Sequence, residues 1–217
     1  LHVRSRRQRQ MCIRDRSYLG GACSPCPDGG YSDPVTYRES RFSYRSIPDT
    51  VRRGALSGYF QSERYFKDFA EEIRSLFQPL IAPVRESTAG VHLRMGDYLQ
   101  KTDVYHTPDA AFLNEAFKNL SDNIRTLVVF SDSPDLARKL VEDVPEARRF
   151  EIVMDEHETL DALRELTAMQ ELVLSCSSFS WWGAWLGSQQ RVFIQKKWFT
   201  GNIEDEQDIF CPTWIKL

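Results

Sequence analysis

The chain has 217 residues, enough for one sizeable domain or for one domain with part of a second. Its hydrophobic fraction of 41% and charged fraction of 27% are ordinary for a globular protein, and no apolar run approaches the roughly 20 residues of a membrane span. The formal net charge is −3, but the first 16 residues hold six arginines against one aspartate, so the remainder carries −8. Such an acidic body argues against a broad nucleic-acid surface.

The start of the chain is rich in arginine, and two interpretations stay open. It is either an arm that binds nucleic acid or a membrane surface, or a non-native leader. No apolar stretch follows the arginines, so the pattern is not that of a signal peptide. Because residues 1–35 are rich in Arg, Gly, Pro and Ser and lack periodicity, we predict that they are disordered or non-native.

The cysteines are odd in number and widely scattered, which argues against a disulfide framework. Cys23 and Cys26 could form half a zinc site or a redox pair, but no second Cys or His pair stands at ligand spacing. We therefore expect reduced thiols and a cytoplasmic protein, with peripheral association at the inner face of the membrane left open.

The first periodic segment begins after Gln61. Ser62 can cap a helix there, and the next apolar residues fall on one helical face: Tyr65, Phe66, Phe69, Ile73 and Phe77. Pro79 and Pro83 end the pattern. We predict one long connecting helix whose aromatic face lies in a core.

Strands and helices alternate from Thr88 onward. Strands are predicted at 90–93, 126–130, 150–154, 172–174 and 191–195, and helices at 109–120, 131–140, 159–169 and 179–186. This alternation is typical of a doubly wound α/β domain with a parallel sheet. In such sheets ligands bind at the carboxyl ends of the strands, in the loops that lead into helices.

The first such loop, 92–98, carries a guanidinium at a strand end. Arg94 can hold a phosphate through two parallel hydrogen bonds, and Gly96 would let the backbone pass close to a ligand. An equally open interpretation is a surface pair between Arg94 and Asp97 around a turn.

The last such loop, 175–186, runs from a serine-rich turn into a helix. Ser177 or Ser178 can cap this helix, whose exposed amides and dipole favour an anion such as a diphosphate. Trp181 and Trp185 are spaced to pack in a core. We expect both features together, with serines facing the ligand and tryptophans packing beneath.

The middle loop offers one carboxylate, Asp132, at a strand end. It could accept hydrogen bonds from a guanine, but the sequence alone favours a cap on the next helix by Asp132 or Ser133. No Asp-x-Asp follows a strand, so we expect no metal, with Arg94 and a helix start offsetting the diphosphate charge.

Taken in order, these loops resemble the α-1,2-fucosyltransferases of glycosyltransferase family 11. The family pattern His-x-Arg-Arg-Gly-Asp-Tyr is matched by 92–98 except at one position, Phe-Ser-Asp by 130–132, and the serine- and tryptophan-rich element by 177–186. Further resemblance lies at 58–66, 197–199 and 212–214, so it covers roughly residues 37–217. The arginine loop and the Trp-rich element together are highly specific to this family.

Three departures from the family pattern stand out. The second arginine of the pair is Met95, which would remove a positive charge near the donor, and the asparagine before the two serines is Cys176. The glycine-rich opening of the family's N-terminal domain is absent. We therefore expect an N-terminally truncated enzyme whose activity is in doubt.

The resemblance implies a GT-B fold whose Rossmann-like donor domain spans 87–217, preceded at 36–86 by a remnant of the N-terminal acceptor domain and the connecting helix. It implies inverting, metal-independent transfer of L-fucose from GDP-β-L-fucose to a galactoside hydroxyl in a bacterial surface glycan, with no cofactor beyond the donor. Arg94 would offset the diphosphate charge, and Asp97 is the candidate base. The substrate-binding residues would be His92, Arg94, Asp132, Ser177, Ser178 and Phe179. The alternatives are an inactive GDP-sugar-binding remnant, a protein O-fucosyltransferase, and a nucleic-acid-binding protein that uses the arginine arm.

Overall fold

The computed structural model describes residues 35–48, 54–201 and 206–217. The predicted leader therefore lies outside the described residues, except for Val35, and so do Cys12, Cys23 and Cys26. Within the described part, no helix is long and apolar enough to cross a membrane.

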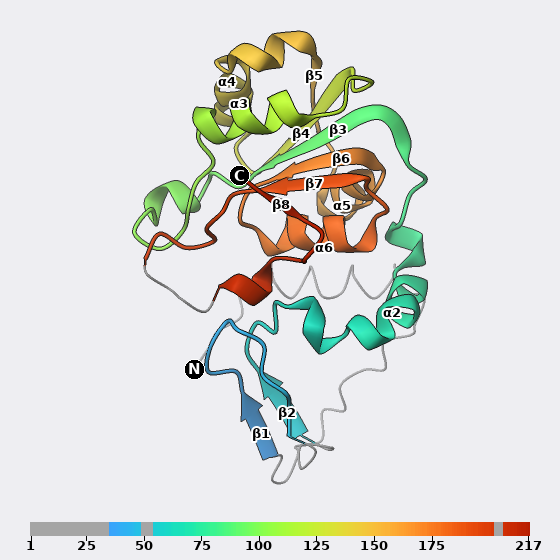
Figure 1. Ribbon diagram of the computed structural model, residues 1–217, viewed down its shortest axis with the longest axis vertical. Helices are drawn as coiled ribbons and strands as arrows, with labels where there is room; N and C mark the ends of the chain where they lie inside the picture. Colours follow the sequence, from blue (N-terminus) through green and yellow to red (C-terminus); the bar gives the residue numbers. More distant parts are fainter. Residues whose placement is uncertain (1–34, 49–53, 202–205) are drawn as a thin grey trace.

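The main body is a six-stranded parallel sheet in the order β5-β4-β3-β6-β7-β8 (Figure 1). From β3 the chain moves outward through β4 to β5, then returns to the other side of β3 and moves outward again. The bounds of the strands are β3 Arg85–Leu93, β4 Thr126–Ser131, β5 Glu151–Met154, β6 Met169–Leu174, β7 Arg191–Ile194 and β8 Ile215–Lys216. This order confirms the predicted doubly wound α/β class and adds its switch point, between β3 and β6.

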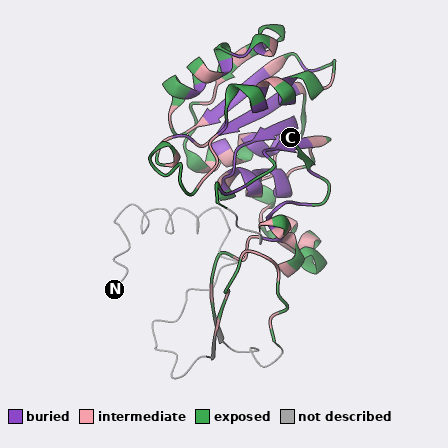
Figure 2. Ribbon diagram, turned by 60° about the vertical axis from the view of Figure 1, so that its left-hand side comes forward, coloured by how far each residue is buried: buried purple, intermediate pink, exposed green. Residues whose placement is uncertain are grey.

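Helices cover both faces of the sheet and divide the core in two. Helices α3 (Ala110–Asn119) and α4 (Pro134–Glu142) pack on one face, and α5 (Thr159–Thr167) and α6 (Ser178–Leu186) on the other. Because successive strand residues point to opposite faces, Val129 joins the first core and Phe130 the second. The central strands are buried on both sides, as Figure 2 shows, which explains their continuous apolar runs.

The predicted helix at 159–169 is too long at its end. Helix α5 stops at Thr167, and Met169 is instead the first residue of β6, fully buried and paired with Arg85 of β3. The predicted strand at 90–93 is too short, because β3 begins five residues earlier, at Arg85. The other predicted strands and helices of this body agree with the structure to within three residues at each end. The two-residue strand β8 was not predicted.

The predicted long connecting helix is wrong. The segment forms short 3-10 turns at Glu63–Tyr65, Lys67–Phe69 and Gln78–Leu80 around one short helix, α2 (Ala70–Leu76). Phe66 breaks the first turn with φ −145°, and its ring stacks on Trp182 at 5.2 Å and meets Trp185 edge-on. Phe69 is 62% exposed, so the aromatic face is only partly in the core. Packing of Phe66 against α6 thus prevails over helical spacing.

A small second sheet precedes the connector. Strands β1 (Val35–Arg38) and β2 (Gly54–Ser57) pair in parallel, apart from the main sheet in Figures 1 and 2. The loop between them reaches the main body, where the Phe42 ring lies 4.7 Å from that of Phe199. The predicted domain boundary after residue 86 falls inside β3 and stays a prediction.

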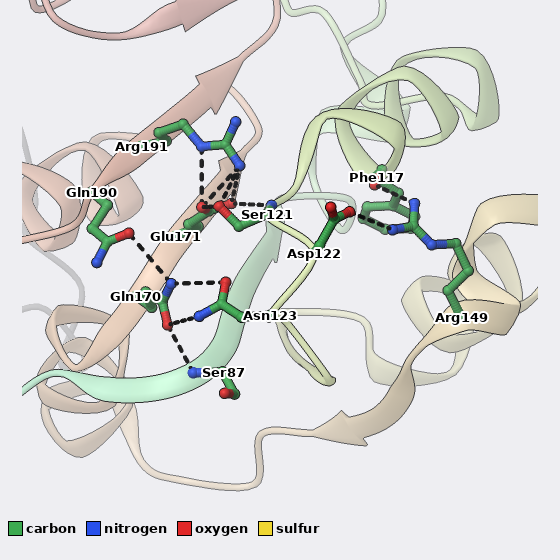
Figure 3. A network of polar contacts seen from close by, with 10 residues as sticks. All are labelled: Ser87, Phe117, Ser121, Asp122, Asn123, Arg149, Gln170, Glu171, Gln190 and Arg191. Atoms are coloured by element: carbon green, nitrogen blue, oxygen red, sulfur yellow. Dashed lines mark hydrogen bonds and ion pairs between the residues drawn. The ribbon is translucent and has the colours of Figure 1, made fainter.

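A polar network joins the amino-terminal ends of the strands (Figure 3). Glu171 of β6 is fully buried and pairs with Arg191 of β7 at 3.0 Å, while the Ser121 hydroxyl donates to Glu171 at 2.5 Å. Gln170 accepts from the amide of Ser87 at 2.8 Å. The network connects the turn before β4 to β3, β6 and β7, at the end of the sheet opposite the three predicted site loops.

Candidate functional site

The predicted site loops meet at the carboxyl ends of β3, β4 and β6. The chain leaves β3 toward α3 on one face and leaves the adjacent β6 toward α6 on the other face. At such a switch point the two connections diverge and leave a crevice, which is where doubly wound sheets bind ligands. The structure therefore brings the arginine loop and the serine-rich loop to the position that the fold favours.

Arg94 is held between two carboxylates. One guanidinium nitrogen lies 2.7 Å from Asp97 and another lies 3.1 Å from Asp132. The side chains of Arg94, Asp97 and Asp132 are 37%, 48% and 25% exposed, so all three reach solvent. The expected surface pair with Asp97 is thus present, but Asp132, from the next strand end, shares the same guanidinium.

Asp132 also anchors the backbone of the arginine loop. One of its oxygens accepts hydrogen bonds from the amides of Met95 at 2.9 Å and Gly96 at 3.2 Å. A side chain at Gly96 would place its Cβ 2.6 Å from the other oxygen, so this close approach requires glycine. The cap that the sequence favoured is wrong: Ser133 holds the N-cap position of α4 without a side-chain bond, and its amide donates to Ser131.

His92 and Ser175 lie side by side at the ends of β3 and β6. The Ser175 hydroxyl accepts from the amide of Arg94 at 2.8 Å and lies 3.3 Å from Nδ1 of His92. Burial lowers the pKa of His92 to about 4; nearby Asp132 acts in the opposite direction, and Arg94 lowers the pKa further. The ring of Phe179 lies 5.4 Å from the imidazole. Sequence reasoning missed the role of Ser175, because its hydrogen-bond partners Arg94 and His92 lie 81 and 83 residues earlier in the chain.

The start of α6 differs from the prediction in one detail. Ser177 occupies the N-cap position, but neither it nor Ser178 makes the side-chain bond that was expected to cap the helix. The nearby hydroxyl of Ser180 points back and donates to the carbonyls of Ser175 and Ser177. Ser178 is exposed and Ser177 is buried. The first amides of α6 thus have no side-chain cap, beside the loop that holds Arg94.

The tryptophans of α6 pack beneath the site, as predicted. Trp181 is 1% exposed, and its indole N–H donates to the carbonyl of Ile209 at 2.6 Å. The ring of Trp185 stacks on that of Trp181 at 6.5 Å, and Trp214 meets Trp181 edge-on at 5.7 Å. The helix therefore holds its serine-rich start by burying its aromatic body.

The sequence from residue 36 to residue 217 matches the model of the family described as glycosyl transferase family 11. The chain belongs to glycosyl transferase family 11. It is 29% identical over 183 residues to an alpha-1,2-colitosyltransferase of Escherichia coli, covering 74% of this chain and 61% of that protein. It is 24% identical over 197 residues to a Caenorhabditis elegans protein with a provisional glycosyltransferase name, covering 75% and 53%. The chain thus spans between half and two thirds of these relatives, and no solved structure matches it significantly.

Met95 stands where the resemblance to family 11 expects an arginine. Its side chain is 8% exposed and packs in the core under α3 and α4, on the face opposite the core around α6. Because neighbouring residues at a strand end point to opposite faces, this side chain does not lie beside the guanidinium of Arg94. The structure thus places Met95 away from the Arg94 guanidinium, and the expected loss of a positive charge near the donor stays a prediction.

Two tyrosines extend the site of this family 11 chain beyond Asp97. The rings of Tyr98 and Tyr105 stack at 4.1 Å, and the guanidinium of Arg94 lies 5.6 Å from the centre of the Tyr98 ring. Burial raises the pKa of Tyr98 to about 12, so its hydroxyl stays protonated at neutral pH. Among the described residues, no three His, Cys, Asp or Glu side chains gather as metal ligands.

Proposed function

We propose that this chain supplies the donor-binding part of an enzyme that transfers L-fucose from GDP-β-L-fucose to a galactoside hydroxyl, forming an α-1,2 linkage with inversion and without a metal. One observation carries the proposal: Arg94 and the uncapped start of α6 converge at the β3/β6 switch point. A guanidinium and free helix amides are the groups that stabilise a leaving diphosphate. Membership of glycosyl transferase family 11 supports the reaction class.

The two carboxylates decide how a diphosphate can bind. Arg94 with Asp97 and Asp132 carries a net charge of −1, so an incoming anion must take over one of the two ion pairs. Asp97 is the more exposed partner and Asp132 is also bonded to two amides, so Asp97 is the one released. A carboxylate freed beside the bound donor is suited to accept the proton of the acceptor hydroxyl.

The geometry supports a positioning role for Asp132 more than a contact with guanine. A carboxylate offers about four acceptor sites, and two amides and Arg94 take up three of those on Asp132. Guanine would present two donors, so both could bind only if the arginine loop gave up a contact. We therefore assign to Asp132 the holding of Arg94 and the loop.

The donor sugar is the least constrained part of the proposal. The name of the E. coli relative gives an α-1,2 linkage and colitose, which is L-fucose without its 3-hydroxyl. Parallel assays with GDP-fucose and GDP-colitose, each with lactose as acceptor, distinguish the two sugars. We expect faster transfer from GDP-fucose, and a clear preference for GDP-colitose would replace fucose in the proposal.

Substitution of Arg94 tests the binding site itself. Arg94→Ala should weaken GDP binding by about an order of magnitude or more, because a charge-assisted contact is lost. Isothermal titration calorimetry with GDP measures this. The matched control is Arg138→Ala, which removes an exposed arginine of α4 whose ion pair among the described residues is with Glu142 along its own helix. Equal GDP affinity in the Arg94 variant and the parent chain would refute the assignment.

Transfer is tested separately, because binding alone fits a second function. GDP-fucose and lactose are incubated with the chain and with a version extended to the length of its relatives, and the trisaccharide is detected by mass spectrometry. GDP binding without transfer in both would favour a GDP-sugar-binding protein over an enzyme. Transfer to a protein acceptor but not to lactose would instead favour a protein O-fucosyltransferase.

A further inference from the structure

We propose that Ser175 is a positioning residue that fixes His92 as a neutral ring with its proton on Nε2, so that His92 donates a hydrogen bond to an oxygen of the bound sugar nucleotide. This inference deepens the proposed function and rests on the nucleotide site described above. It concerns two buried side chains at the ends of the two strands that flank the switch point, β3 and β6.

The position of the proton follows from the partners of Ser175. The amide of Arg94 can only donate, so at 2.8 Å the Ser175 hydroxyl accepts from it. Ser175 is 1% exposed, and a hydroxyl so buried needs a partner for its own proton. Nδ1 of His92, at 3.3 Å, is its other hydrogen-bond partner. The hydroxyl therefore donates to Nδ1, and a neutral imidazole that accepts at Nδ1 carries its proton on Nε2.

The surroundings of His92 keep the ring neutral. The groups that face it are the Asp132 carboxylate, which favours the charged form, and the Arg94 guanidinium, which opposes it. Burial is the largest effect and outweighs that of Asp132, so burial and Arg94 together hold the pKa of His92 at about 4, while the Phe179 ring covers one side. At neutral pH His92 is thus a fixed donor and acceptor, and it does not shuttle protons.

Nε2 is left for a ligand. No hydrogen bond joins Nε2 to a described residue. Nε2 is also not among the fully buried, unpartnered polar atoms of the described chain, so it keeps some contact with solvent. His92 is one residue before the end of β3, beside the loop that holds Arg94, and 6% of its surface stays exposed. An N–H fixed there can donate to a phosphate or ribose oxygen without a rotational cost, because Ser175 has already set the ring.

Variants that mimic one ring nitrogen test the donor. His92→Gln places an amide N–H near the position of Nε2, so its GDP affinity should stay within about threefold of the parent. His92→Phe keeps a ring without a donor, so its GDP affinity should fall by roughly five- to tenfold. Ser175→Thr keeps the hydroxyl and should bind like the parent, while Ser175→Ala should lose affinity as His92→Phe does. Calorimetry with GDP measures all four variants. Parent-like affinity in His92→Phe would overturn the proposal.

Histidine NMR tests the tautomer in the unaltered chain, and a variant is needed only to assign the signal. In protein labelled with ¹⁵N-histidine, the His92 signal, assigned by its loss in His92→Gln, should be that of the Nε2–H tautomer and should not titrate between about pH 5.5 and 8. Titration near pH 6.5, or an Nδ1–H signal, would refute the inference. If Arg94→Ala weakens GDP binding but His92→Phe does not, only this inference fails. If the parent chain does not bind GDP, the proposed function fails first.

Discussion

At the scale of single residues, the sharing of Arg94 between two carboxylates shapes the chemistry of the site. Exposed ion pairs contribute roughly 0–1 kcal/mol each, so a diphosphate can displace one at little cost. Asp97, at 48% exposure, is such a partner, whereas Asp132 is bound into the loop by two amides. The site therefore has one carboxylate that can move and one that is fixed.

Asp97→Asn separates the two roles that this arrangement gives to Asp97. Removal of its charge leaves Arg94 with one competing carboxylate, so we expect GDP affinity to rise about two- to fivefold at low salt and less at high salt. If the freed carboxylate is the base, transfer should fall about 100-fold or more in the same variant. Calorimetry and a transfer assay give the two values.

A matched control for this prediction is Asp103→Asn, an exposed aspartate of the same connection. It should leave both values unchanged. A fall in GDP affinity for Asp97→Asn would contradict the displacement of Asp97 by the diphosphate, since it would mean that Asp97 holds Arg94 in its binding position.

Residue roles were harder to predict from the sequence than residue positions. The motif loops were found at the strand ends where the structure has them, because apolar runs and turn residues are local signals. The partners of Asp132 and Ser175 lie 36 to 83 residues away, so the sequence could not show that both side chains anchor the arginine loop. The family pattern also does not show that the Met95 side chain, after the end of β3, turns into the core under α3 and α4.

At the scale of elements, tertiary packing decides where prediction succeeds. Strands such as β4 are buried on both faces and appear in the sequence as continuous apolar runs, so they were predicted almost to the residue. The connector at 63–80 has helical spacing, yet it breaks at Phe66 because that ring packs among the tryptophans of α6. Spacing cannot reveal such a break, since the partner lies more than 110 residues further along the chain.

The contact between α5 and α6 gives a prediction at this scale. A Cβ at Gly183 of α6 would overlap Leu166 of α5, which is fully buried and cannot move aside. Gly183→Ala gains about 1 kcal/mol of helix propensity but overpacks the core by roughly 1–3 kcal/mol. We expect a net loss of about 0–2 kcal/mol in the free energy of unfolding, measured by urea denaturation.

The control for this contact is Ser188→Ala, just past the end of the same helix. Ser188 is exposed, so its substitution leaves the contact between Gly183 and Leu166 unaltered. Its stability should stay within about 0.5 kcal/mol of the parent. Equal losses in both variants would mean that helix packing is not the cause.

At the scale of the whole molecule, the parallel sheet separates its two ends by function. The strand order β5-β4-β3-β6-β7-β8 places the candidate site at one end of the sheet. This order could not be predicted, because the alternation of strands and helices does not show on which side of β3 each later strand is added. The opposite end carries the buried Glu171, paired with the partly exposed Arg191 (Figure 3). Stability and binding should therefore be separable by substitutions at the two ends.

Arg191→Ala tests this separation, with Glu171→Gln as its counterpart. Glu171 is fully buried, so loss of its partner leaves a carboxylate that Ser121 alone satisfies among the residues of the described ranges, and this should cost roughly 3–5 kcal/mol of unfolding free energy. Glu171→Gln leaves Arg191, which is 35% exposed and can turn toward water, so we expect a smaller cost of about 1–2 kcal/mol. Urea denaturation gives both values, and calorimetry on the folded variants should find GDP affinity unchanged. A smaller loss for Arg191→Ala than for Glu171→Gln would mean that water reaches Glu171. A large fall in GDP affinity in either folded variant would mean that the two ends of the sheet are coupled.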